Sequence, residues 1–176
     1  MKLLAYITCL SFFTLFLFSG CGKQEEESTI IKDYQISRND VIDNSQTRFD
    51  DKVSYDENGS LVINAASPEV IHLYETGDID VENAQLVYRA NVKTEGVSGN
   101  VFLEMWCDFG DKGEYFSRGL QSVITGTEGW KTLETVFFLK KGENPDNVKL
   151  NVAIDGKGIV WVDDLKLIKR PFNYTE

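Results

Sequence analysis

Apolar side chains alternate with polar ones along short segments of the chain, at the two-residue period of a half-buried β-strand. Residues 85–94 place Leu86, Tyr88, Ala90 and Val92 on one face and Val87, Arg89, Asn91 and Lys93 on the other. Residues 101–109 place Val101, Leu103, Met105 and Cys107 on one face and Phe102, Glu104, Trp106 and Asp108 opposite. These two segments are the clearest predicted strands.

Further strands are predicted at 60–65, 70–75, 115–124, 130–139 and 148–155, with a last one in GKGIVWVDDLKLI at 156–168. Turns that contain glycine separate many of them, and the 3 prolines fall between or after strands. No long segment has the 3.6-residue period of a helix. Many short strands at regular spacing are typical of a β-sandwich or barrel, and we expect one domain.

In the first twenty residues, Lys2 is followed by an apolar run that is short for a bilayer span. This pattern predicts a secretory signal peptide. It ends in Phe-Ser-Gly-Cys, which resembles the lipobox of bacterial lipoproteins, although the usual leucine is replaced by Phe18. The resemblance implies a diacylglyceryl group on the Cys21 sulfur and an acyl chain, such as palmitate, on its amino group. Residues 21–33 then read as a polar tether and residues 34–176 as the folded domain.

Charge and cysteine content narrow the function classes. The formal net charge is −10, which argues against nucleic acid as a partner. Apart from Cys9 in the signal and Cys21 at the lipobox, the chain has only Cys107, so no intramolecular disulfide is expected. Gly22 follows the lipobox cysteine, and by the lipoprotein resemblance this favours the outer membrane of a bacterial envelope over retention in the inner membrane.

The segment from Leu86 to Ile168 resembles the galactose-binding-like jelly roll of CenC-type carbohydrate-binding modules. The matching stretches are YRANVKTEGVSG at 88–99, GTEGW at 126–130 and GKGIVWVDDLKL at 156–167. The resemblance implies an all-β jelly-roll sandwich and a non-catalytic module that binds envelope or extracellular glycan. The alternatives are an envelope protein-interaction or scaffold module with the same fold, and a glycoside hydrolase.

A candidate ligand face is predicted on the strand at 101–109. An aromatic ring packs on the C–H face of a sugar, and planar polar groups fix its hydroxyls. The predicted ligand-binding residues are Trp106, Glu104, Phe102 and Asp108, with Arg89 and Asn91 projecting from the preceding strand. In the opposing interpretation the aromatic rings belong to the core and the carboxylates are simply solvated. If the register is inverted, every assignment on this face changes sides.

The last strand carries an irregularity at Asp163-Asp164. Val160 and Val162 lie on one face of an ideal strand and Leu165 and Leu167 on the other. A β-bulge at the two aspartates brings all four apolar residues inward. The carbohydrate-binding resemblance implies a structural Ca²⁺ at Asp163, with Asp164 beside it and further oxygens from Asp50 in residues 49–51 or from the turn at 56–59. An aspartate that accepts backbone N–H bonds needs no metal, and both readings stay open here.

The sequence shows no well-supported set of catalytic residues. Nothing in the sequence brings the single histidine, His72, to Cys107, and Cys107 shares its face with apolar residues, so a buried thiol is expected. Glu104 and Asp108 are four residues apart on one strand, or about 13 Å. Glycosidases need their two carboxyl groups within about 5–9.5 Å. The prediction is therefore that the protein is not an enzyme.

Overall fold

The computed structural model describes residues 27–36 and 45–172, so the signal peptide, Cys21 and the start of the tether lie outside the described part. The strands are β1 (Thr29–Tyr34), β2 (Thr47–Asp50), β3 (Ser60–Ala65), β4 (Glu69–Gly77), β5 (Ala84–Asp108), β6 (Glu114–Arg118), β7 (Ile124–Leu139) and β8 (Asn147–Arg170). One short 3₁₀ helix, η1 (Gly110–Lys112), joins β5 to β6. No helix in the described ranges is both long enough and apolar enough to cross a membrane.

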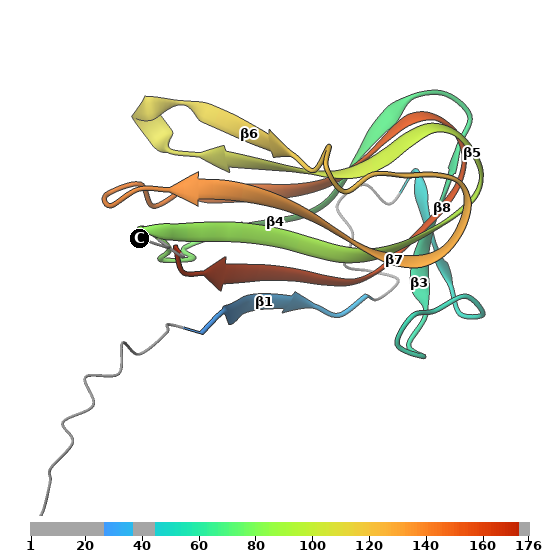
Figure 1. Ribbon diagram of the computed structural model, residues 1–176, viewed down its shortest axis with the longest axis horizontal. Helices are drawn as coiled ribbons and strands as arrows, with labels where there is room; N and C mark the ends of the chain where they lie inside the picture. Colours follow the sequence, from blue (N-terminus) through green and yellow to red (C-terminus); the bar gives the residue numbers. More distant parts are fainter. Residues whose placement is uncertain (1–26, 37–44, 173–176) are drawn as a thin grey trace, which may run out of the picture.

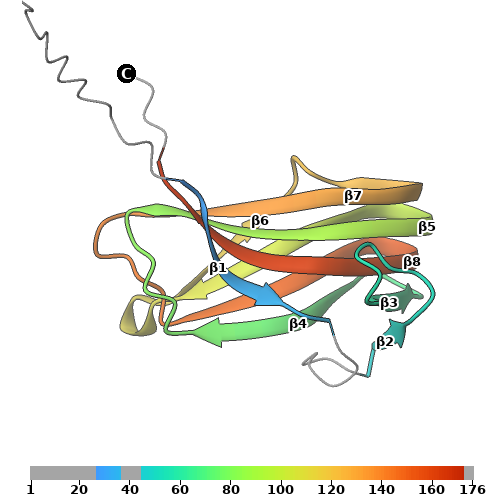
Figure 2. The ribbon, with the colours of Figure 1, turned by 90° about the horizontal axis from the view of Figure 1, so that it is seen from below.

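Two long strands, β5 and β8, are paired along their whole length and bend together, so that one ladder forms both layers of a sandwich (Figure 1). The first layer contains β1, residues 159–170 of β8, residues 84–95 of β5, and β7. The second layer contains β4, residues 147–155 of β8, residues 101–108 of β5, and β6. Figure 2 shows the two layers facing each other, with β2 and β3 at the bent end. The all-β sandwich is confirmed.

Glycines permit the bend. A Cβ on Gly156 would lie 1.5 Å from the carbonyl oxygen of Ser98, and a Cβ on Gly99 would lie 1.7 Å from that of Asp155. The two backbones therefore approach too closely for any side chain at these positions. The sequence predicted turns between separate strands here, whereas the structure has bends within continuous ones.

The core lies between the layers and confirms the predicted inward faces. The side chains of Leu86, Tyr88, Ala90 and Val92 from the first layer, and of Val101, Leu103, Met105 and Cys107 from the second, are fully buried. Burial of each large apolar side chain stabilises the fold by about 1.5–3 kcal/mol. Alternate residues of β5 must therefore point outward in both layers, and because the layers face each other, their outer faces lie on opposite sides of the molecule.

The predicted bulge in β8 is confirmed. Arg89 pairs with Lys166 and Asn91 pairs with Asp163. Between these two pairs β5 advances by two positions and β8 by three, so β8 contains one extra residue. Asp164 takes up the slip with a φ of 50°, in the left-handed region that aspartate tolerates better than most residues. Val160, Val162, Leu165 and Leu167 are consequently all buried.

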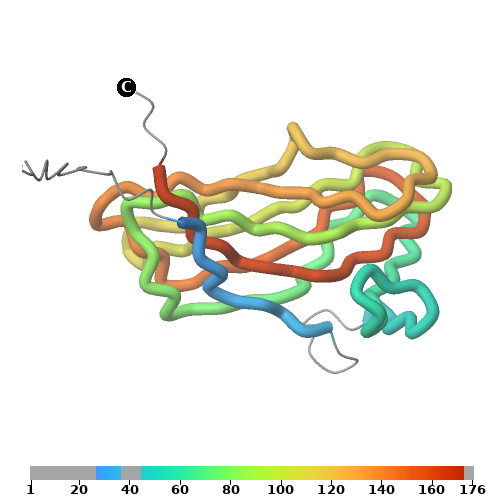
Figure 3. Tube along the Cα trace, turned by 60° about the horizontal axis from the view of Figure 1, so that its bottom comes forward, coloured from blue at the N-terminus to red at the C-terminus, as the bar shows by residue number. Residues whose placement is uncertain are grey.

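The domain starts earlier than predicted. Residues 29–33 were assigned to the tether, but β1 pairs with β8 from Thr29↔Lys169 to Tyr34↔Leu165. Ile31 and Tyr34 also pack against the core. Backbone pairing and these two contacts hold the strand, although Ile30 is exposed and the other three residues are polar. Figure 3 shows that the start of β1 and the end of β8 lie together at the end of the sandwich away from the bend.

Candidate functional site

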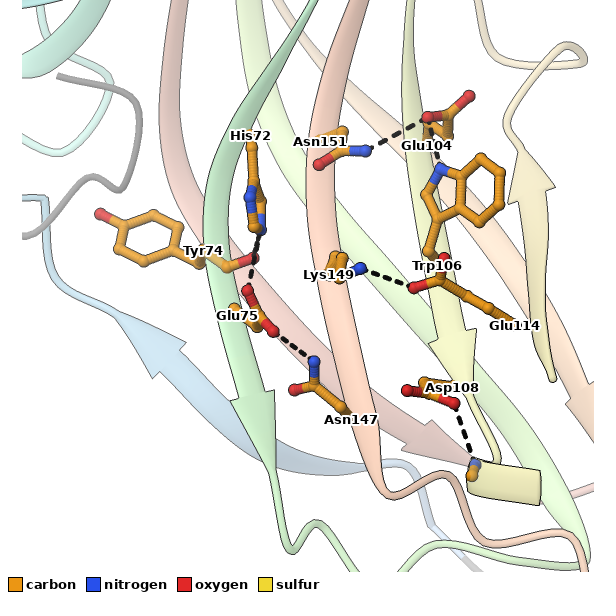
Figure 4. A network of polar contacts seen from close by, with 11 residues as sticks. His72, Tyr74, Glu75, Glu104, Trp106, Asp108, Glu114, Asn147, Lys149 and Asn151 are labelled. Carbon is orange, nitrogen blue, oxygen red and sulfur yellow. Dashed lines mark hydrogen bonds and ion pairs between the residues drawn. The ribbon is translucent and has the colours of Figure 1, made fainter. Parts of the chain in front are cut away.

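The outer face of the second layer carries two rows of side chains across four strands. The strand registers place Phe116, Trp106, Lys149 and Glu75 in one row, from β6 through β5 and β8 to β4. The neighbouring row is Arg118, Glu104, Asn151 and His72. We call these eight residues the β6–β4 face, and its centre is drawn in Figure 4.

Glu104 organises this face. Its side chain is only 3% exposed, and its carboxylate accepts hydrogen bonds from Trp106 Nε1 at 2.7 Å, Asn151 Nδ2 at 3.2 Å and Arg118 Nε at 2.6 Å. Burial by itself raises the pKa of Glu104, but these donors outweigh burial and hold the pKa below its ordinary value. The carboxylate is therefore an ionised, fixed acceptor that sets the orientation of its neighbours.

The Trp106 ring is held from two sides. Its N–H is bound to Glu104, and its ring packs against Phe116 with centroids 4.9 Å apart and planes tilted by 43°. The Arg118 guanidinium lies over the other aromatic ring, 4.8 Å from the Phe116 centroid. Phe116 is 51% exposed and Trp106 is half-buried. An ordered aromatic surface beside polar groups is what packing against a sugar ring requires.

A shallow pocket of about 280 Å³ adjoins these rings and is lined by Val70, His72, Trp106, Glu114, Lys149 and Asn151. Lys149 Nζ lies 2.7 Å from Glu114 Oε1. That contact is the main reason why the pKa of Lys149 is raised, and the negative charges of Glu75 and Asp108 add to it. The pocket is therefore polar and anionic on one side and aromatic on the other.

The floor of the pocket contains a buried acceptor that is not satisfied. Asn151 is 8% exposed, and its Oδ1 has no hydrogen-bond partner among the described residues. Figure 4 shows its amide nitrogen turned to Glu104 and its oxygen turned toward β4. A buried polar atom without a partner destabilises the fold by about 1–3 kcal/mol, so a bound donor at this point is favoured.

Four of the six predicted ligand residues lie on this side of the molecule. Glu104 and Trp106 are at the centre, and Phe102 is half-buried on the same strand face. Asp108 lies at the end of the strand, where its Oδ1 accepts a hydrogen bond from Gly110 N at 2.9 Å and holds the turn into η1. The pattern along one strand was sufficient to find them.

Arg89 and Asn91 were wrongly placed with this group. The bend of β5 puts them on the outer face of the first layer, on the opposite side of the sandwich. Arg89 pairs with Glu134, and Asn91 is buried between Asp164 and Thr132. Their role in this layer is structural, because each is bound to neighbours from the adjacent strands.

Sequence reasoning did not find Asn151, Lys149, His72, Phe116, Arg118 or Glu114. These residues come from β4, β6 and β8, and only the cross-strand register brings them beside Trp106. The sequence contains the alternation of each strand but not which strands are neighbours. The polar residues Lys149 and Asn151 between buried Val148, Leu150 and Val152 were the one available signal.

The two aspartates of the bulge serve as structural acceptors. Asp163 accepts hydrogen bonds from Tyr55 N at 2.7 Å, Ser54 Oγ at 3.3 Å and Asp164 N at 2.8 Å. Burial raises the pKa of Asp163, and these donors only partly oppose that effect. Asp164 accepts from Asn91 and pairs with Lys166. These contacts support the backbone-capping alternative.

The proposed calcium ligands do not form one set. Asp163 and Asp164 line a polar cavity of about 210 Å³ together with Asp56, Asn58 and Gly59 of the predicted turn, whereas Asp50 is not among its lining residues. Asp50 accepts from Trp161 Nε1 at 3.0 Å and from the backbone of the following turn, and its pKa is lowered chiefly by the Trp161 contact. Ca²⁺ takes 6–8 oxygen ligands, and oxygens of Asp163, Asp164 and Asp50 already accept hydrogen bonds within the protein. Within 27–36 and 45–172, no three His, Cys, Asp or Glu residues are grouped to hold a metal.

The catalytic pair that the sequence disfavoured is separated in space. Cys107 points into the core and is fully buried, and burial raises the pKa of its thiol to about 12. His72 lies on the opposite face of the second layer, 3.2 Å from the carbonyl oxygen of Tyr74. The expectation of a buried thiol is confirmed.

Comparison with solved structures supports the architecture. The CBM22-2 xylan-binding domain of Paenibacillus barcinonensis Xyn10C has a TM-score of 0.53 at 10% identity, over 82% of this chain and 98% of that one. The CBM22-1–CBM22-2 tandem of the same protein gives 0.57 at 13%, over 87% and 49%. The fold is the jelly roll of carbohydrate-binding modules.

A third similar structure is the Clostridium thermocellum xylanase 10B CBM22-1–GH10 fragment complexed with xylohexaose, with a TM-score of 0.53 at 14% identity. The match covers 75% of this chain but only 26% of that one, so this chain spans about a quarter of that fragment. No protein-family model and no curated protein sequence matches the chain. The comparisons therefore establish the fold, and the CenC-type assignment stays a prediction.

Proposed function

We propose that the protein binds carbohydrate without catalysis through the β6–β4 face, as the jelly-roll domain of a lipid-anchored envelope protein. The observation that carries the proposal is the Trp106 ring fixed by Glu104 beside the unsatisfied Oδ1 of Asn151. Such a face offers a sugar an apolar surface beside polar groups that Glu104 holds in place.

The chemistry of binding follows from the two rows. A pyranose ring packs its C–H face on Trp106 and Phe116, and its hydroxyls meet the polar groups beside them, which are Asn151 and the Lys149–Glu114 pair. Strands lie about 4.8 Å apart, so the rows cross about 14 Å from β6 to β4. A ligand that extends over more than one sugar unit makes use of all four strands.

The state of Glu104 supports binding over hydrolysis. A glycosidase needs one carboxyl group that is protonated near neutral pH as the general acid. The pKa of Glu104 is lowered instead, and three donors already occupy its oxygens. We therefore assign Glu104 the role of a positioning residue that fixes Trp106, Asn151 and Arg118.

The alternative function is a protein-interaction module of the envelope. A protein partner is favoured by a continuous apolar patch. On the β6–β4 face, charged residues instead flank Trp106 along β5 and Phe116 along β6, and this favours the glycan. The anchor at Cys21 and the outer-membrane location are part of the proposal, and they rest on the lipobox resemblance alone.

A glycan array with the purified protein tests the proposal. We expect binding of at least one polysaccharide-derived glycan, and we expect Phe116→Ala to weaken it. Phe138→Ala is the matched control, because Phe138 is also an exposed phenylalanine, at 61%, but lies on β7 of the first layer. If no glycan binds, the function is wrong. If Phe138→Ala rather than Phe116→Ala abolishes binding, the site is wrong.

A further inference from the structure

When Glu114 and Asp108 beside it are counted as well, the β6–β4 face has an excess of negative charge. The carboxylates are Glu75, Glu104, Asp108 and Glu114, and the cations are Arg118 and Lys149. With His72 neutral, the carboxylates exceed the cations by two. Uncompensated charge in and around a pocket discriminates between ligands of opposite sign.

Each cation is already paired with a carboxylate of the protein. Lys149 is bound to Glu114 at 2.7 Å and Arg118 to Glu104 at 2.6 Å. The remaining basic group, His72, has its Nε2 3.6 Å from Glu75 and 3.2 Å from the carbonyl oxygen of Tyr74. A uronate on this face would lie near carboxylates and would have to compete with Glu104 or Glu114 for a cation, so its binding is disfavoured.

The unsatisfied oxygen of Asn151 in the pocket also favours a cationic ligand over an anionic one. Asn151 Oδ1 accepts hydrogen bonds and donates none. The second functional group of that amide is committed to Glu104, which prevents the side chain from turning round to present a donor. A ligand that enters the pocket therefore satisfies it with an N–H or O–H group, and an ammonium is the strongest such donor.

We propose that the β6–β4 face selects for amino sugars and against uronic acids. This inference rests on the proposed function and adds the charge of the ligand. At a pH where the amine is protonated, a glycan with primary amino groups binds more tightly than the neutral glycan of the same linkage. The corresponding uronate binds most weakly.

Three matched probes test the order: hexasaccharides of β-1,4-linked glucosamine, glucose and glucuronate, titrated separately into the purified protein by calorimetry. Each step in the order is expected to change the Kd by about 2- to 5-fold at low ionic strength, the size typical of partly exposed charge pairs. At about 0.5 M salt the differences shrink, because screening acts over a few ångströms.

Two variants separate local charge from overall charge. Glu114→Gln removes a carboxylate of the pocket and releases Lys149, so the glucosamine preference falls and the glucuronate improves. Glu95→Gln removes the same charge at the bend of β5, outside the pocket, and leaves the order unchanged.

The outcomes are distinct. Equal affinity for the three probes, or tightest binding of glucuronate, overturns the charge selection and leaves the proposed function standing. A shift with Glu95→Gln as large as with Glu114→Gln also overturns it, because overall charge would then explain the order. If none of the three binds, the inference fails, and an empty glycan array shows whether the proposed function fails with it.

Discussion

The Asp163 carboxylate accepts a hydrogen bond of 2.7 Å from the backbone N–H of Tyr55, 108 positions earlier in the chain. This contact joins the bulge of β8 to the loop that precedes β3, at a side chain that is only 2% exposed. The two adjacent aspartates of the last strand therefore have different tasks. Asp163 supplies acceptors to the loop, and Asp164 supplies the backbone geometry of the bulge.

We expect Asp163→Asn to lower the free energy of unfolding by about 1–3 kcal/mol. In the wild type, Tyr55 N–H and Asp164 N–H bond to different oxygens of Asp163. The asparagine amide has only one oxygen, so one of these two N–H groups would face the NH₂ group and lose its acceptor. Asp164→Asn is the matched comparison and should cost less, because asparagine also tolerates a positive φ and keeps an oxygen for Asn91, so that only the pair with Lys166 is lost. Chemical denaturation of both variants measures the difference. Equal destabilisation by the two changes contradicts the division of roles.

Removal of divalent metal should leave the melting temperature unchanged. The oxygens of Asp163 and Asp50 already accept from backbone N–H groups, a hydroxyl and an indole, so the structure accounts for these carboxylates without a cation. A thermal melt with and without a chelator is the measurement. A drop that Ca²⁺ restores, and that Asp163→Asn abolishes, would establish the calcium hypothesis instead, since a ligand bound to the folded state raises its stability.

Glu104→Gln should destabilise the protein at neutral pH by about 1–3 kcal/mol, because it weakens the bonds from Trp106, Arg118 and Asn151. The folded pKa of Glu104 is lowered, so the ionised group stabilises the fold above its ordinary pKa of 4.5. That stabilisation is lost as pH falls below 4.5 and through the folded pKa. The difference in free energy of unfolding between wild type and variant should therefore become smaller in acid. A difference that stays constant down to the acid transition contradicts the lowered pKa of Glu104.

Cys21→Ser tests the anchor. If Cys21 carries the lipid, the variant should leave the membrane fraction or keep its signal peptide, because the sulfur that receives the diacylglyceryl group is gone. Membrane fractionation and the mass of the mature protein are the readouts. A variant that is cleaved and still fractionates with membranes like the wild type rules out lipidation at this residue.

The fold was largely predictable because burial imposes a period of two on each strand. The inward faces of residues 86–92 and 101–107 and the bulge at Asp163 all follow from which side chains avoid water. Strand β1 was missed because only Ile31 and Tyr34 of its six residues pack against the core. Its stability comes from backbone pairing, which leaves almost no trace in the amino-acid sequence.

The site was predictable only along a single strand. The alternation that places Trp106 opposite Met105 correctly put it outside the core. Arg89 was assigned to the same site because β5 was treated as two successive strands in one layer. The glycine contacts that bend β5 and β8 between layers involve residues far apart in sequence, such as Gly156 and Ser98. Long-range pairing of this kind is not encoded in any local pattern.

The central claim is that Trp106 contributes to ligand binding and is not part of the core that stabilises the fold. The most direct measurement is melting and glycan titration on the same Trp106→Ala protein, using a glycan that the wild type binds. We predict a loss of affinity of about 1–3 kcal/mol, or about 5- to 150-fold, with a stability loss below the roughly 3–5 kcal/mol of a core tryptophan. Trp130→Ala, on β7 against Tyr55, should retain affinity. Unchanged affinity in Trp106→Ala would contradict the account.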